Sequence, residues 1–184
     1  DEAVLSYQRA IAIKPDYADA YGNLGSLLID LDEIAAAAKA LTKAIALKPD
    51  LASAHNSLGV VLKKQEKFSE AVASHKKALT LAPNYAEGHN NLGNALNEQG
   101  KLSEAASSYR QALAINPNYA NAHYNLGHAL TFLGELDRAR AALKRALVLE
   151  PQSVKARYNL GMVNLATGNI EAGWRDYELR LTLK

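Results

Sequence analysis

Apolar residues recur along this chain with the spacing of amphipathic helices. In residues 86–99, His89, Leu92 and Leu96 fall at i, i+3 and i+7, so a helix would place them on one face. A second pattern of the same kind covers residues 102–114. Matching patterns precede and follow these two segments, and together they predict pairs of short helices along the whole chain.

The prolines and the Leu-Gly pairs show that these helix pairs form a repeat. Leu-Gly stands at 24–25, 58–59, 92–93, 126–127 and 160–161. The five prolines keep the same 34-residue period, at Pro15, Pro49, Pro83, Pro117 and Pro151. A fixed period of this length indicates a solenoid of stacked helix pairs. We expect the periodic glycines, together with alanines at fixed positions, to let the helix backbones approach one another closely.

Small and polar residues mark the ends of the predicted helices. Gly100, Gly134 and Gly168 stand where the first helix of a pair must stop, and we expect a left-handed conformation there. Asp32 and Glu66 take this place in the earlier pairs, where the same conformation is less relaxed. Each proline ends a second helix, and the residue after it is expected to cap the next helix, namely Asp16, Asp50, Asn84 or Asn118.

These residues resemble the tetratricopeptide repeat (TPR), whose pattern is an aromatic residue, Leu-Gly, a large residue, Ala, an aromatic residue and Pro over about 34 residues. Residues 86–119 fit through His89, Leu92-Gly93, Leu96, Ala105, Tyr109 and Pro117. The resemblance covers the whole chain and implies an all-α, right-handed superhelical solenoid of antiparallel helix pairs. It implies the second helix of an incomplete repeat in 1–17, full repeats in 18–51, 52–85, 86–119 and 120–153, and a fifth, truncated or capping repeat in 154–184.

The first helices of TPR proteins line a concave surface that usually holds the ligand, so the resemblance also implies a binding groove. One position of this groove carries an amide in four of the five repeats, and we call it the asparagine ladder: Asn23, Ser57, Asn91, Asn125 and Asn159. An amide both donates and accepts hydrogen bonds, so the ladder is predicted to grip the backbone of an extended peptide or partner protein. The alternative is that asparagine only keeps an exposed face soluble. The predicted groove comprises Asn23, Asn56, Ser57, Asn90, Asn91, Asn94, Asn121, Tyr124, Asn125, His128, Lys155, Tyr158 and Asn159.

The same resemblance allows a prediction about ligand charge. Some TPR adaptors hold an acidic C-terminus with a clamp of Lys, Arg and Asn side chains. At the aligned positions here, Lys155 is retained, but Asn90 and Asn159 replace two of the three cations. Because most charge-assisted bonding is lost, we expect binding that tolerates many sequences and depends little on salt.

Composition limits the remaining function classes. The chain has 21 basic and 19 acidic residues and no polybasic run, so neither nucleic acid nor a membrane surface is an expected partner. It has no cysteine and no HExxH motif, and His55, His89 and His123 recur because they fill the aromatic slot of the repeat. No metal, cofactor or enzymatic activity is therefore predicted. No uncharged run has the length of a membrane span and no signal peptide is visible, so a cytoplasmic location is expected.

The two ends of the chain give further hypotheses. Residues 1–17 form a second helix without its first, so Val4, Tyr7 and Ile11 are expected to form an exposed apolar face that promotes self-association. Near the other end, the stretch GWRDYELR (173–180) is interpreted as a capping helix with a polar outer face. Alternatively, it resembles the junction at which bacterial O-GlcNAc-transferase-like proteins pass from their TPR array into a catalytic domain. This favours two functions: a protein-interaction scaffold, or the substrate-recruiting arm of a larger glycosyltransferase.

Overall fold

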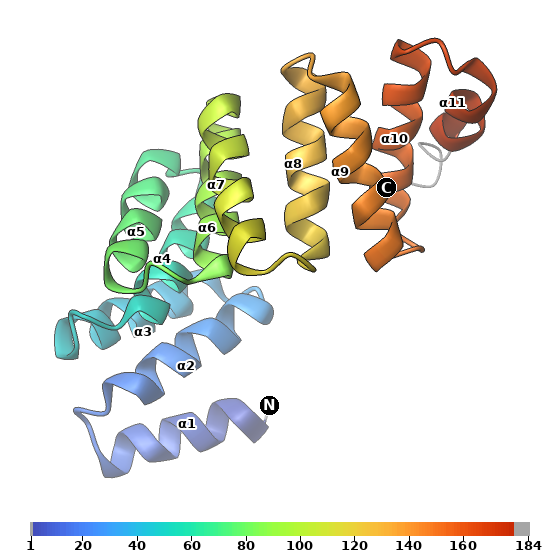
Figure 1. The fold of residues 1–184 in the computed structure, drawn as a ribbon. Helices are drawn as coiled ribbons and strands as arrows, with labels where there is room; N and C mark the ends of the chain where they lie inside the picture. Colours follow the sequence, from blue (N-terminus) through green and yellow to red (C-terminus); the bar gives the residue numbers. More distant parts are fainter. Residues whose placement is uncertain (1, 179–184) are drawn as a thin grey trace. The chain divides into compact units, whose positions relative to one another are not determined.

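The computed structural model describes residues 2–178, and the regular structure within this range is helical, with no β-strand. Helices and short turns alternate along the chain (Figure 1). The helices are α1 (Glu2–Ile13), α2 (Ala18–Asp30), α3 (Ile34–Leu47), α4 (Ala52–Lys64), α5 (Phe68–Leu81), α6 (Ala86–Glu98), α7 (Leu102–Ile115), α8 (Ala120–Phe132), α9 (Leu136–Leu149), α10 (Val154–Ala166) and α11 (Ile170–Tyr177). The predicted all-α fold of paired helices is confirmed.

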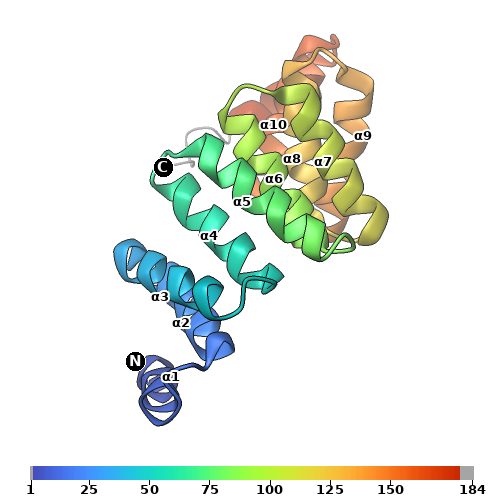
Figure 2. The same ribbon diagram turned by 90° about the vertical axis from the view of Figure 1, so that its left-hand side faces the viewer.

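The chain divides into two compact units, an N-terminal unit of residues 1–95 and a C-terminal unit of residues 96–184. In the N-terminal unit, α2 packs on α3 and α4 packs on α5, and the first helices α2 and α4 also touch (Figure 2). In the C-terminal unit, α8 packs on α9 and α10 packs on α11, while α7 contacts α8 and α9 contacts α10 (Figure 1). Each of these helices therefore buries its apolar face against its partner in the pair and against the next repeat.

The glycines of the Leu-Gly pairs at 24–25 and 126–127 bring the two helices of their repeats into close contact. A Cβ atom built on Gly25 would lie 2.5 Å from Cγ of Leu41, and one built on Gly127 would lie 2.6 Å from Cγ of Leu143. Leu41 and Leu143 are both fully buried. The predicted close approach is confirmed, and it requires glycine because any side chain would overlap the neighbouring helix.

The turns after the first helices have the predicted left-handed backbone. Gly100, Gly134 and Gly168 have φ angles of 72°, 76° and 81°. Asp32 and Glu66 adopt nearly the same conformation, with φ angles of 60° and 61°. A side chain costs roughly 1–2 kcal/mol in this conformation, so the two early turns are more strained than the three later ones.

Three of the four predicted helix N-caps are wrong. α2, α4 and α8 begin after Tyr17, Leu51 and Tyr119, one residue later than predicted, and none of these side chains makes a capping hydrogen bond. The turn explains the shift: the Tyr17 amide donates to the Lys14 carbonyl at 3.1 Å, so Pro15 and Asp16 are the central residues of a β-turn. The residue after each of these prolines is therefore used in the turn rather than as the cap, which corrects Asp16, Asp50 and Asn118. In the last repeat Ser153 does act as a cap, because its hydroxyl accepts from the Ala156 amide at 3.4 Å.

The exposed face predicted for α1 is also wrong in its members. Val4, Tyr7 and Ile11 are half-buried and pack against the core of the N-terminal unit. The apolar side chains that α1 leaves in solvent are Leu5, at 51% exposure, and Ile13, at 86%. Val4, Tyr7 and Ile11, at i, i+3 and i+7, pack inward because α2 offers an apolar surface on that side.

No helix among residues 2–178 combines the length and the apolar character that crossing a bilayer would require.

Gly161 offers a direct test of the close helix contact. A Cβ atom there would lie 2.7 Å from the backbone nitrogen of Tyr177, and backbone cannot rotate away as a side chain can. Gly161→Ala should lower the free energy of unfolding by roughly 1–3 kcal/mol through overpacking, measured by urea denaturation. The control is Gly88→Ala, where the nearest atoms are movable side chains of Tyr85 and Leu79 at 3.0 and 3.1 Å. Equal stability of the two variants would contradict this packing argument.

Candidate functional site

The site predicted from the sequence lies along the first helices, and α8 shows its geometry most fully. One face of α8 packs inward through Leu126 and Leu130, which are buried in the C-terminal unit. The opposite face reaches solvent along the whole helix. It carries the exposed Asn121 and the half-buried Tyr124, Asn125 and His128.

The next first helix, α10, touches α8 and continues this surface. Lys155 is exposed near its N-terminus, and the half-buried Tyr158 ring stacks on Tyr177 with the ring centroids 5.5 Å apart. Asn159 is only 4% exposed, and its Nδ2 makes no hydrogen bond with the described residues. Burial raises the pKa of the Tyr124 hydroxyl, and the nearby Asn159 side chain opposes this rise.

In the N-terminal unit the corresponding surface is less aromatic. Asn23 on α2 is exposed, and Ser57 on α4 is half-buried. The hydroxyls of Ser57 and Ser26 lie 2.8 Å apart, so they join α2 to α4 at the position of the asparagine ladder. On α6, Asn91 and Asn94 are half-buried.

Asn56 belongs to a polar cluster inside the N-terminal unit rather than to its surface. It is 1% exposed, and its Oδ1 accepts from Nδ1 of His75 at 2.9 Å and from Nδ2 of Asn91 at 3.3 Å. Its Nδ2 lies 3.2 Å from both the Tyr85 hydroxyl and a Glu87 carboxylate oxygen. The Asn56 amide thus uses its full hydrogen-bonding capacity, and it connects α4 to α5 and α6.

His75 is the member of this cluster whose pKa is shifted. It fills the slot that Leu41 and Leu143 fill in their repeats, and a Cβ atom on Gly59 would lie 2.5 Å from its ring. Burial, helped by the positive charge of Lys63, lowers the pKa of His75 from 6.5 to about 4. The ring is therefore neutral at pH 7 and donates from Nδ1 to Asn56.

The structure brings part of the predicted groove to the surface and buries the rest. Asn56, Asn90 and Asn159 are buried, so they can only support their neighbours. Side-chain length explains two of them: Asn56 and Asn90 occupy the repeat position of Tyr124 and Tyr158, whose longer side chains do reach solvent. The accessible members are Asn23, Ser57, Asn91, Asn94, Asn121, Tyr124, Asn125, His128, Lys155 and Tyr158.

Phe132 extends this surface and was missed by the sequence analysis. Its ring is 63% exposed and lies 4.9 Å from the His128 ring, which is 6.3 Å from the Tyr124 ring. The three aromatic residues form a row at i, i+4 and i+8 on α8. The sequence contains this spacing, but Phe132 is not part of the repeat pattern from which the groove was predicted.

The histidines of the aromatic slot have a structural task. His55, His89 and His123 each donate from Nε2 to the carbonyl of the proline six residues earlier, at 2.9 Å in all three cases. Arg157 makes the same contact with the Pro151 carbonyl at 2.7 Å. These bonds attach the start of each first helix to the turn before it. Within residues 2–178 no three His, Asp or Glu side chains are placed to hold a metal ion.

The last helix bears on the two hypotheses for residues 173–180. Gly173 is buried, and a Cβ atom there would lie 2.7 Å from the Leu165 side chain. The exposed face of α11 is mixed rather than polar, because Ile170 and Trp174 are about half exposed. Leu179 and Arg180 lie outside the described residues, so the junction hypothesis rests on the resemblance alone.

The fold and this surface define a class: a repeat protein whose first helices present amides and aromatic rings to solvent. Models of the TPR repeat match residues 1–32, 25–66 and 93–131, and further models of the tetratricopeptide repeat match 52–85, 76–106 and 124–181. The chain belongs to the tetratricopeptide repeat family. Membership supports a role as a protein-interaction scaffold, because TPR proteins generally bind proteins or peptides, and those built only of such repeats are generally not catalytic.

Solved structures are similar over nearly the whole chain. YrrB, described as a TPR protein with an unusual peptide-binding site, aligns at 24% identity with a TM-score of 0.75 over 97% of this chain and 92% of its own. PilW, a type IV pilus biogenesis factor, aligns at 21% identity with a TM-score of 0.86 over 98% of this chain and 89% of its own. TTC0263, a TPR protein of Thermus thermophilus, aligns at 26% identity with a TM-score of 0.72 over 90% of this chain and 96% of its own. At these identities the likeness concerns the fold. Comparison with curated protein sequences gives no significant match.

The buried histidine predicts a pH dependence of stability. The unfolded chain protonates His75 near pH 6.5 and the folded chain only near 4, so between these values the unfolded state binds more protons. The free energy of unfolding is therefore unaffected by the titration of His75 above pH 6.5, and it falls by about 3 kcal/mol as the pH drops to 4. In His75→Leu this loss should be absent, which urea denaturation at pH 7, 5.5 and 4.5 would measure. Parallel pH profiles of the two proteins would show that His75 titrates normally.

Proposed function

We propose that the first helices bind an extended segment of a partner protein across their accessible face. The observation that carries this proposal is the row on α8, where Asn121, Tyr124, Asn125 and His128 all reach solvent on the face away from the core. Lys155 and Tyr158 on the adjoining α10 widen this face. An uncharged row of amides and rings of this kind suits a peptide backbone and its side chains better than it suits a small charged ligand.

The two kinds of side chain have different roles in this proposal. The amides of Asn121 and Asn125 pair with peptide groups, which are the same for every sequence. The rings of Tyr124, His128 and Phe132 offer apolar area for the side chains of the ligand. Burial lowers the pKa of His128 despite the opposing charge of Glu98, so its ring stays neutral at pH 7 and adds no charge to this surface.

The buried asparagines support this face rather than touch the ligand. Asn56 accepts from Asn91, so it fixes one member of the asparagine ladder at the surface of α6. Asn159 is buried near Tyr124, whose pKa its side chain affects. Substituting Asn56 or Asn159 would therefore disturb packing, and a test of binding must use the exposed amides instead.

The test compares variant and control proteins with the same ligand. Peptides selected from a displayed random library on the wild-type protein are labelled and titrated by fluorescence polarisation. Asn121→Ala with Asn125→Ala should weaken binding by roughly 1–3 kcal/mol, at about one net kcal/mol per hydrogen bond. The control is Asn84→Ala, which removes an exposed amide from the turn between α5 and α6.

The effect of salt provides the second readout. Affinity should change little between low and high salt, because contacts made by neutral amides and rings are not screened as ion pairs are. Unchanged affinity in the double variant would reject the ladder as the binding element. A steep fall in affinity with salt would instead indicate that charged groups elsewhere on the protein carry the binding.

A further inference from the structure

A cavity lies on the other side of α8, away from the asparagine ladder and its aromatic row. It has a volume of about 360 Å³ and is formed by α7, α8 and α9 within the C-terminal unit. Its apolar wall comes from Leu113, Leu126, Leu130, Ala141 and Ala142. Three guanidinium groups surround this wall, those of Arg110, Arg138 and Arg145. We call this feature the arginine-rimmed cavity.

The positive charge of the rim is only partly neutralised. Arg138 pairs with Glu135, with Nη1 2.7 Å from a carboxylate oxygen. Arg145 donates to the neutral Oδ1 of Asn118 at 2.6 Å, and neither Arg145 nor Arg110 forms an ion pair with the described residues. Two guanidinium groups therefore stand beside an apolar wall without a carboxylate, and each retains donors in a fixed planar arrangement.

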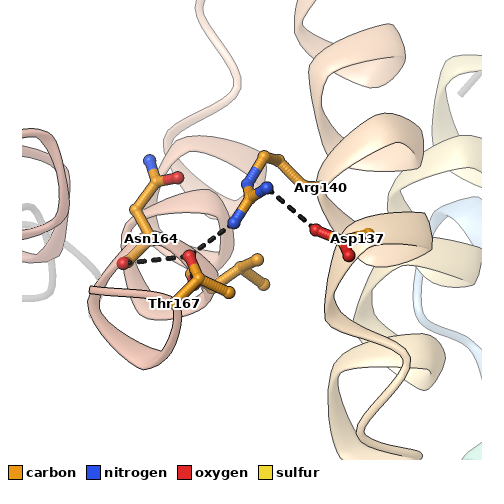
Figure 3. A network of polar contacts seen from close by, with 5 residues as sticks. Asp137, Arg140, Asn164 and Thr167 are labelled. Carbon is orange, nitrogen blue, oxygen red and sulfur yellow. Dashed lines mark hydrogen bonds and ion pairs between the residues drawn. The ribbon is translucent and has the colours of Figure 1, made fainter. Parts of the chain in front are cut away.

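Arg140 of α9 provides a comparison, because its guanidinium is bound by neighbouring residues of the protein. Figure 3 shows its guanidinium between Asp137 and Thr167, so that it links α9 to the turn after α10. Nη1 donates to the Asp137 carboxylate at 3.0 Å, Nη2 donates to the Thr167 hydroxyl, and that hydroxyl lies 3.2 Å from the Asn164 carbonyl. Arg140 has a carboxylate partner in the protein, whereas Arg110 and Arg145 have none among the described residues.

The arginines of the rim are not a requirement of the repeat. One repeat earlier, the positions of Arg138 and Arg145 hold Glu104 and Gln111. The second helix of that repeat, α7, has the same length as α9 without these charges, so the helix itself does not require arginine at either position. Other repeats are also basic at two of these positions, through Arg9, Lys43 and Lys77 at the position of Arg145 and through Lys76 and Lys144 at that of Arg110. This repeat differs in carrying a third cation, Arg138, and in using arginine, whose donors lie in a fixed plane.

We propose that the arginine-rimmed cavity binds an acidic segment of a partner protein that carries a large apolar side chain beside its carboxylates. The apolar wall takes the side chain, and Arg110 and Arg145 take flanking carboxylates by paired N–H···O bonds. Charge complementarity selects this partner, because a basic or neutral segment would leave the guanidinium groups unpaired. This site is separate from the face proposed above, and it differs from that face in its positive charge and in its expected dependence on salt.

The probe is a labelled peptide in which leucine and phenylalanine alternate with glutamates, titrated by fluorescence polarisation against the full chain. Arg110→Gln with Arg145→Gln should weaken its binding by about tenfold for each arginine, as expected for charge-assisted hydrogen bonds. Ala141→Trp should abolish binding, because the exposed Ala141 lines the cavity and a large ring would fill it. Affinity should fall steeply as salt is raised.

Two matched controls separate this site from general charge effects. Lys144→Gln removes a cation from the face of α9 that carries Arg140, and it should leave the affinity unchanged. Asn121→Ala with Asn125→Ala should also leave it unchanged, so failure of the groove proposal and failure of this one are distinguishable. Thermal unfolding monitored by circular dichroism shows that each variant is folded.

Several results would overturn the proposal. Equal binding of a peptide with serines in place of leucine and phenylalanine would show that charge alone acts, without the cavity. Full affinity in the double arginine variant, or in Ala141→Trp, would remove the site. Binding to phosphatidylserine vesicles that requires Arg110 and Arg145, with no peptide binding, would assign the surface to a membrane instead.

Discussion

In three repeats a glycine on the first helix contacts a large residue on the second helix, and this contact sets how the two helices pack. Leu41, His75 and Leu143 lie so close to Gly25, Gly59 and Gly127 that a Cβ atom on any of these glycines would overlap the facing side chain. Because this contact fixes which face of the first helix turns inward, it also fixes which face is left for solvent. On α8 the inward face holds Leu126 and Leu130, and the amides and rings are left outside. The candidate groove is a consequence of that packing.

A polar residue in this contact changes its surroundings. Two other repeats place Leu41 and Leu143 at this position, whereas His75 brings a ring nitrogen into a fully buried slot, and a buried donor must find an acceptor. Asn56 provides it, and its remaining capacity is met by Asn91, Tyr85 and Glu87. One substitution in the core thus recruits four polar groups from two neighbouring helices and a turn. This is why part of the asparagine-rich surface of the N-terminal unit serves stability instead of remaining available to a ligand.

The sequence predicted the fold closely because the fold depends on local rules. The expected helices 86–99 and 102–114 are observed as Ala86–Glu98 and Leu102–Ile115, since the left-handed Gly100 follows the first helix and Pro117 follows the second. The site was predicted less well, because periodicity gives the face of a residue but not its depth. Asn23 and Asn159 share one repeat position, yet the first is exposed and the second is buried beside Tyr124. The N-caps failed for a related reason: turn geometry, which composition does not reveal, places Asp16 before the cap rather than at it.

The two proposed surfaces of the C-terminal unit share α8 and divide it by face. Tyr124 and Asn125 point to one side, while His123, Leu126 and Leu130 line the arginine-rimmed cavity on the other. A ligand on either face could affect the other only by moving α8, and the tight contact between Gly127 and Leu143 opposes such a movement. The two sites should therefore bind almost additively, as separate sites without shared partners do. A partner that offered an extended neutral segment to one face and an acidic, apolar segment to the other would gain affinity from linkage rather than from any change in the protein.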